Sequence, residues 1–136
     1  MKKTMLVAAA TGLLLSACAS HHARDARLSK PDPHNPSVFV VDDKYIVVNQ
    51  EPIYLPKSDK DATIVWQLPK GSPYSFPADG IVITLPDGEF NCNLEADKQR
   101  FRCKFKNSKP GRYKYTISVI GGKGPIKPLD PYIVND

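Results

Sequence analysis

The chain has 136 residues, enough for one domain, and its 41% hydrophobic and 24% charged residues are ordinary values for a globular protein. Its 13 prolines exclude a helical bundle, because a proline inside a helix removes a hydrogen bond and clashes with the preceding turn. The net charge is +5, and Lys2 and Lys3 account for two of these charges.

Residues 1–17 have the pattern of a signal peptide. Lys2 and Lys3 precede an apolar run over residues 5–15, which is shorter than the ~20 residues that a membrane-spanning helix needs. The run ends in Leu15-Ser16-Ala17-Cys18, which resembles the lipobox of bacterial lipoproteins, where small residues precede a cysteine that is lipidated and becomes the new N-terminus. The alternative is an ordinary secretory signal peptide in which Cys18 has no role.

The resemblance implies a lipid anchor at Cys18 and, since Ala19 rather than aspartate follows it, transport to the outer membrane with the domain facing the periplasm.

Residues 18–37 hold three prolines and one large apolar residue, so we expect a disordered tether. It contains all three histidines, His21, His22 and His34. They could loosely hold a metal ion with Asp25, but a mobile segment loses too much entropy on ordering, which favours a solvated linker.

Lipidation of Cys18 leaves Cys92 and Cys103, and an even pair in the oxidising periplasm predicts a disulfide. Reduced, buried thiols are the alternative. A zinc site needs more ligands than these two cysteines, and no histidine follows His34.

Short runs of β-branched and aromatic residues, spaced about ten residues apart, predict eight or nine strands and no helix. The expected runs are 37–41, 44–49, 53–55, 62–68, 81–85, 89–95, 99–106, 112–121 and 129–134. They predict one all-β domain over residues 38–136, an antiparallel β-sandwich of the immunoglobulin-like kind. Trp66 is expected to anchor its core, and the last strand to lie at a sheet edge.

Residues 89–106 predict a hairpin in which Cys92 faces Cys103. Direct pairing of the two cysteines places opposite charges across both ends of the hairpin, which supports this register. A disulfide between directly paired residues is often strained, so an offset register is the alternative. The charged pairs are Glu95 with Arg100 and Glu89 with Lys106. The next strand is expected to turn Tyr113, Tyr115, Ile117 and Val119 inward.

Residues 98–114 carry eight basic residues and no acidic one. Six of them are expected to share one exposed sheet face: Arg100, Arg102, Lys104, Lys106, Arg112 and Lys114. Such a face could bind an anion, namely a lipid headgroup, a lipopolysaccharide phosphate or an acidic protein. The favoured interpretation is a solvated face that opposes edge-to-edge pairing. The periplasmic location and the lack of outward aromatic residues argue against nucleic acid.

The sequence predicts a protein that is not an enzyme, because residues 38–136 contain no histidine and no cysteine outside the expected disulfide. Gly121-Gly122-Lys123-Gly124 is too short for a phosphate-binding loop. The neighbouring aspartates, Asp42-Asp43 and Asp59/Asp61, lie in expected turns.

No cofactor, metal or small-molecule substrate is inferred. We expect an outer-membrane lipoprotein that contacts an envelope protein or supports the envelope; an anion-binding module and a periplasmic inhibitor or immunity lipoprotein are the alternatives.

Overall fold

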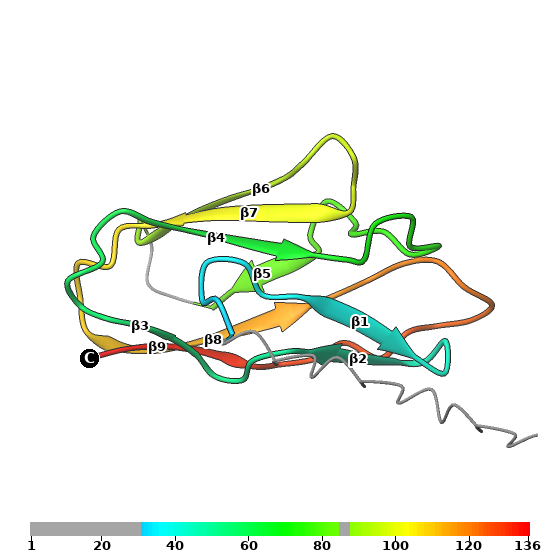
Figure 1. Ribbon diagram of the computed structural model, residues 1–136, viewed down its shortest axis with the longest axis horizontal. Coiled ribbons are helices and arrows are strands. Elements are labelled where there is room, and N and C mark those ends of the chain that lie inside the picture. The colour runs from blue at the N-terminus through cyan, green and yellow to red at the C-terminus, as the bar shows by residue number, and fades with distance from the viewer. Residues whose placement is uncertain (1–30, 85–87) are drawn as a thin grey trace, which may run out of the picture.

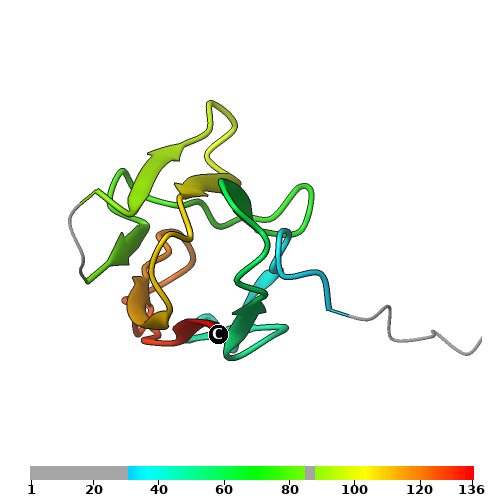
Figure 2. The ribbon, with the colours of Figure 1, turned by 90° about the vertical axis from the view of Figure 1, so that its left-hand side faces the viewer.

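The computed structural model describes residues 31–84 and 88–136, and within them no helix is long and apolar enough to cross a membrane. Nine strands form an all-β sandwich, as the sequence predicted (Figure 1). One sheet has the order β4 (Ala62–Gln67), β7 (Arg100–Phe105), β6 (Phe90–Leu94). The other has the order β3 (Ile53–Leu55), β9 (Tyr132–Asn135), β8 (Gly111–Ile117), β5 (Ile81–Ile83). A hairpin of β1 (Val38–Val41) and β2 (Tyr45–Val48) lies at one side of the sandwich (Figure 2).

The core lies between the two sheets because successive side chains of a strand point to opposite faces, and the apolar residues of β4, β7 and β8 share the inward face. On β4, Ile64 and Trp66 are fully buried, and on β8, Tyr115 and Ile117 are. The rings of Trp66 and Tyr115 meet across the core with centroids 5.2 Å apart. The predicted core position of Trp66 and the inward direction of alternate residues on β8 are therefore confirmed.

The predicted hairpin register of β6 and β7 is confirmed residue by residue. Cys92 pairs with Cys103, and the two cysteines form the expected disulfide with Cα atoms 4.0 Å apart. The charged side chains, however, pair differently from the expectation. Arg102 binds Glu95, two residues beyond its cross-strand partner Asn93, and Arg100 binds Asp97 in the turn. Diagonal neighbours are within reach of such long side chains.

The expectation that the last strand lies at a sheet edge is wrong. β9 lies between β3 and β8, antiparallel to β8 and parallel to β3, so the sandwich includes a parallel ladder. Ile133 and Asn135 of β9 are both buried.

The folded part begins before Val38, so the expected tether is too long at its C-terminal end. The carbonyls of His34 and Pro36 accept hydrogen bonds from Val65 and Gln67 of β4, and Pro36 is fully buried. This segment covers the open side of β4, which protects that sheet edge. The lipobox and the rest of the tether lie outside the described residues.

The immunoglobulin-like topology stays a prediction, and the strand order is compatible with it. β4, β7 and β6 correspond to the B, E and D strands of such sandwiches, and β5, β8 and β9 to C, F and G. The Tyr113 hydroxyl near the start of β8 donates a 2.7 Å hydrogen bond to the Lys109 carbonyl, the contact known as a tyrosine corner.

Candidate interaction surface

The six basic residues expected on one face are divided between two sheets. Arg100, Arg102 and Lys104 belong to β7, and Lys106 follows this strand directly. Arg112 and Lys114 belong to β8 of the other sheet. Phe105 and Tyr113, which alternate with these residues, meet inside the sandwich with ring centroids 5.4 Å apart. The basic side chains of the two strands therefore point away from each other, and the single basic face was a wrong expectation.

The basic residues of β8 are held by neighbours on their own sheet. Lys114 forms a 3.1 Å ion pair with Asp130, and the Arg112 guanidinium lies 3.9 Å from the centroid of the Tyr132 ring. A guanidinium over an aromatic face is attracted to the ring electrons. These contacts connect β8 to the segment that contains β9, and Asp130 partly neutralises the charge of Lys114.

On β7, the arginines and the lysines differ. Arg100 bonds Asp97 at 2.8 Å and Arg102 bonds Glu95 at 2.5 Å, and the hydrogen bond from Arg100 lowers the pKa of Asp97. Within residues 31–84 and 88–136, neither Lys104 nor Lys106 forms an ion pair. The remaining positive charge of this face is therefore concentrated at its Lys104 and Lys106 end.

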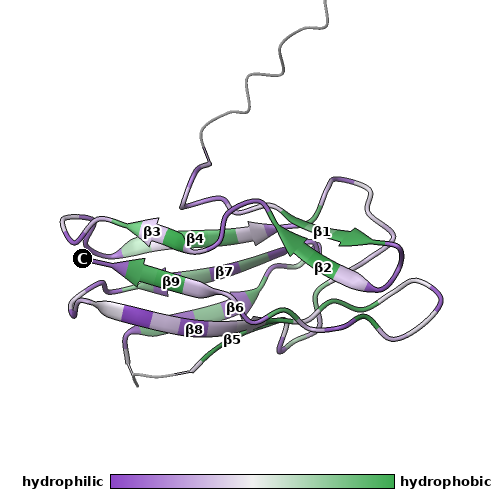
Figure 3. Cartoon of the chain, turned by 90° about the horizontal axis from the view of Figure 1, so that it is seen from below, coloured by the Kyte–Doolittle hydropathy of each residue, from purple (hydrophilic) through white to green (hydrophobic). Residues whose placement is uncertain are grey.

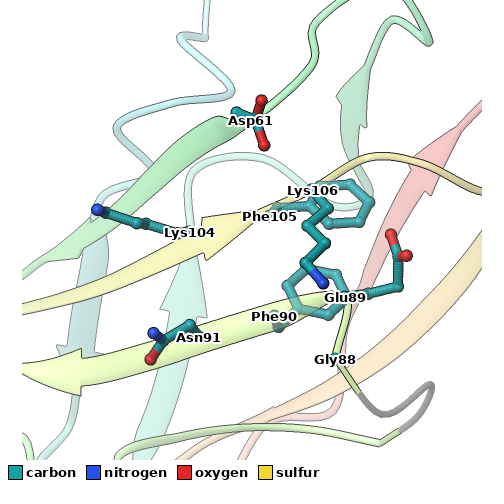
Figure 4. A pocket seen from close by; sticks show the side chains of 8 residues that line it. All are labelled: Asp61, Gly88, Glu89, Phe90, Asn91, Lys104, Phe105 and Lys106. Atoms are coloured by element: carbon teal, nitrogen blue, oxygen red, sulfur yellow. The ribbon is translucent and has the colours of Figure 1, made fainter.

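A depression of about 240 Å³ lies at that end (Figure 4). Its lining residues are Asp61, Gly88, Glu89, Phe90, Asn91, Lys104, Phe105 and Lys106. The stacked rings of Phe90 and Phe105, with centroids 4.2 Å apart, supply its apolar part. The depression is smaller than ordinary small-molecule sites, which enclose about 300–1,000 Å³. It suits a single protruding group of a larger partner better than an enclosed ligand.

The side chain of Glu89, which lines the depression, is directed toward Ser108. It is 5% exposed and accepts hydrogen bonds from the backbone N–H of Ser108, at 3.1 Å, and from the Ser108 hydroxyl. The Ser108 hydroxyl contributes most to lowering the pKa of Glu89 below its usual 4.5, with smaller contributions from Lys109 and Lys106.

Replacing Ser108 with alanine is expected to raise the pKa of Glu89 and to destabilise the fold above about pH 4.5. A carboxylate whose pKa is lowered by folding stabilises the protein above its unfolded pKa, and this contribution is lost as pH falls through the folded pKa. The difference in unfolding free energy between wild type and S108A should thus shrink between pH 7 and pH 3. Urea titrations at both pH values, with an NMR titration of Glu89, measure it. A difference independent of pH would contradict the assignment.

β6 is an edge strand with one side unpaired in the described part of the chain. The Glu95 N–H donates to the Arg100 carbonyl, and the Lys106 N–H donates to the Glu89 carbonyl. Every second residue between Glu89 and Glu95 therefore forms the backbone hydrogen bonds with β7. The intervening residues, Phe90, Cys92 and Leu94, therefore direct their N–H and C=O groups away from β7. This edge can accept an added strand.

His34 was expected in the tether, but the structure places it against β4. Its Nδ1 lies 2.9 Å from the Thr63 carbonyl oxygen and its Nε2 lies 2.9 Å from Asp59 Oδ2. With one ring nitrogen at a carbonyl and the other at a carboxylate, neither is placed to take a proton from a nucleophile. No cluster of three or more metal-ligating side chains occurs among residues 31–84 and 88–136. His21, His22 and Cys18 lie outside the described residues.

Sequence reasoning missed the outer face of the β1–β2 hairpin. Apolar residues occupy both faces of these strands, so the runs Val38–Val41 and Tyr45–Val48 leave apolar side chains on the surface. The exposed ones are Phe39, Val41, Tyr45 and Val47. The lack of apolar and polar alternation in the two runs was the available indication.

The comparisons with known proteins assign no family. No protein-family model matches the sequence, and the comparison with curated proteins finds no match. The function is therefore argued from the surfaces described above.

Proposed function

We propose that the protein is a non-enzymatic outer-membrane lipoprotein whose β-sandwich binds an envelope protein by strand addition at the β6 edge. The lipobox-like sequence ending at Cys18 supports the anchor, and the disulfide between Cys92 and Cys103 suits an oxidising compartment. Three acyl chains, at ~0.8 kcal/mol per buried CH₂, would hold the protein firmly in the membrane.

The observation that carries the proposal is the unpaired side of β6. A segment laid along it would exchange backbone hydrogen bonds with Phe90, Cys92 and Leu94, which supply affinity in β-strand addition. Its side chains would alternate between the partly buried side of Phe90 and the outer face of Asn91 and Asn93. Lys104 pairs with Asn91 and Arg102 with Asn93, so acidic outward residues would be favoured on the partner.

Leu94→Pro is expected to weaken partner binding about tenfold, whereas Leu94→Ala is expected to leave it nearly unchanged. Both variants lose the leucine side chain, but only proline lacks the N–H that faces the open side, and the partner's carbonyl would remain unpaired at a cost of about 1–3 kcal/mol. Proline is tolerated at this kind of position on an edge strand.

The measurement has two steps. A photo-crosslinking residue at Asn93 of the lipidated protein first captures and identifies the partner in cells. The affinity of that purified partner is then measured for wild type, L94P and L94A, with the fold of each checked by circular dichroism. Equal affinities for the two variants, or no crosslinked protein, would refute strand addition at this edge.

The alternative function is an anion-binding module. It is favoured by Lys104 and Lys106 beside the depression, neither of which forms an ion pair in the part of the chain that the structure describes. Lys104 and Lys106 could bind a phosphate of a lipid headgroup or of lipopolysaccharide, or a carboxylate of an acidic partner. Reversing Arg102 and Lys104 to glutamate should abolish such binding and leave strand addition largely intact. Reversing Arg112 and Lys114, on the opposite sheet, is the matched control for total charge.

A further inference from the structure

The outer face of the β1–β2 hairpin is a contiguous exposed apolar surface, here called the hairpin patch. It consists of two cross-strand pairs, Phe39 with Val47 and Val41 with Tyr45. Their exposures are 42%, 46%, 45% and 46%, respectively. The inward residues of the same strands, Val38, Ile46 and Val48, are buried in the core, so the fold fixes the direction of the patch. Figure 3 shows the apolar character of both strands.

The patch lies on the side of the domain where the chain enters the described structure. Gln50, just after β2, donates a 2.6 Å hydrogen bond to the Asp32 carbonyl, and Ser37 N–H donates to Asn49 Oδ1 at 2.8 Å. In Figure 2 the first described residues, drawn in blue, lie on the same side of the sandwich as the hairpin. This entry point is close to the hairpin in both sequence and space.

The length of chain before this point limits the distance to the anchor. Twelve residues lie between Cys18 and Pro31, and even a fully extended chain over this stretch reaches at most about 45 Å. A short link of this kind gives the patch a high effective concentration at the membrane surface that holds the lipid. A second copy of the chain or a diffusing protein does not have this advantage.

We propose that the hairpin patch docks on the phospholipid surface beside the lipid anchor and fixes the orientation of the domain. This inference rests on the proposed lipidation of Cys18. Phe39 and Tyr45 would enter the boundary between headgroups and acyl chains, where aromatic residues are favoured. The face carrying β6 would then remain accessible to a periplasmic partner.

The charges around the patch fit an anionic lipid surface. Lys44 Nζ lies 5.3 Å from the centroid of the Tyr45 ring, and the Lys127 N–H donates to the Lys44 carbonyl, which places both lysines at the turn end. Lys70 shares a shallow depression with Phe39 at the other end. The turn aspartates Asp42 and Asp43 oppose these three lysines, which leaves a small positive excess around the patch. The Asp43 carboxylate also accepts a hydrogen bond from the Tyr74 hydroxyl.

The test compares two tryptophan probes in the full-length lipidated protein. Val47 of the hairpin patch and Val82 of β5 have matched exposures of 46% and 48%. The β1–β2 hairpin and β5 lie on opposite sides of the sandwich (Figure 2). Each is replaced by tryptophan, and the protein is reconstituted into vesicles of phosphatidylethanolamine and phosphatidylglycerol with brominated acyl chains. Buried Trp66 gives the same background in both variants.

We expect bromine to quench the added emission of V47W at least twofold and to leave that of V82W nearly unchanged. Phe39→Ser in the V47W protein should reduce this quenching. Equal quenching of the two probes, or none of V47W, would overturn the inference. Protection of V47W that rises with protein concentration without bromine quenching would assign the patch to a second copy instead. Mass measurement of the mature N-terminus separately tests lipidation, so an unlipidated Cys18 would refute the anchor and not the docking geometry.

Discussion

Trp66→Ala is expected to lower the free energy of unfolding by about 3–5 kcal/mol, the usual cost of truncating a fully buried large aromatic residue. Trp66 is 0% exposed, and its Nε1 donates a 3.3 Å hydrogen bond to the Tyr115 hydroxyl. The substitution leaves a cavity between the sheets and a buried hydroxyl without this partner. Burial also raises the pKa of the Tyr115 hydroxyl, because a charged phenolate between the sheets would lose its hydration.

Urea unfolding followed by far-ultraviolet circular dichroism measures the effect without needing the tryptophan as a probe. Val65→Ala is the matched control, because Val65 lies on the same strand with its side chain on the outer face. Its cost should stay well below that of Trp66→Ala. Similar losses for the two variants would mean that the sandwich is not packed around Trp66.

Replacing both Cys92 and Cys103 by alanine is expected to cost about 3 kcal/mol on the chain-entropy model for a short loop. The two cysteines are 11 residues apart in sequence and join β6 to β7. Without the disulfide the unfolded chain gains conformational freedom, and β6 is held only by its ladder with β7 and by its side-chain packing.

Urea titration of the double variant, compared with wild type under reducing and non-reducing conditions, tests this loss. Reduced wild type should unfold at nearly the same urea concentration as the double variant. An unfolding midpoint that does not change on reduction would show that the disulfide adds nothing to stability.

Local sequence pattern was enough to predict the strands and the register of one hairpin. The alternation on β7 and β8 identifies the inward side of each strand, and the cysteine pair fixes the register of β6 against β7. Alternation cannot tell which sheet a strand joins, because the chain between β7 and β8 is equally able to turn back or to cross over. It crosses over, and this separated Arg112 and Lys114 from the basic residues of β7.

The remaining differences have a similar physical origin. Residues 31–37 looked like a linker because they are polar and proline-rich, yet their backbone pairs with β4 and Pro36 is buried. Backbone hydrogen bonding of this kind leaves little trace in composition. The β6 edge and the hairpin patch depend on which strands have neighbours, which is a property of the whole fold and not of any one segment.

The position of β9 has a consequence for when the protein can fold. β9 is the last strand to be synthesised, yet it lies between β3 and β8 and joins the beginning of the domain to its end. Until residues 132–135 emerge, the four-stranded sheet is divided into two parts that share no ladder. The ladders that β9 forms with β3 and β8 connect the two parts through a contact between distant segments, so we expect the four-stranded sheet to close late in folding.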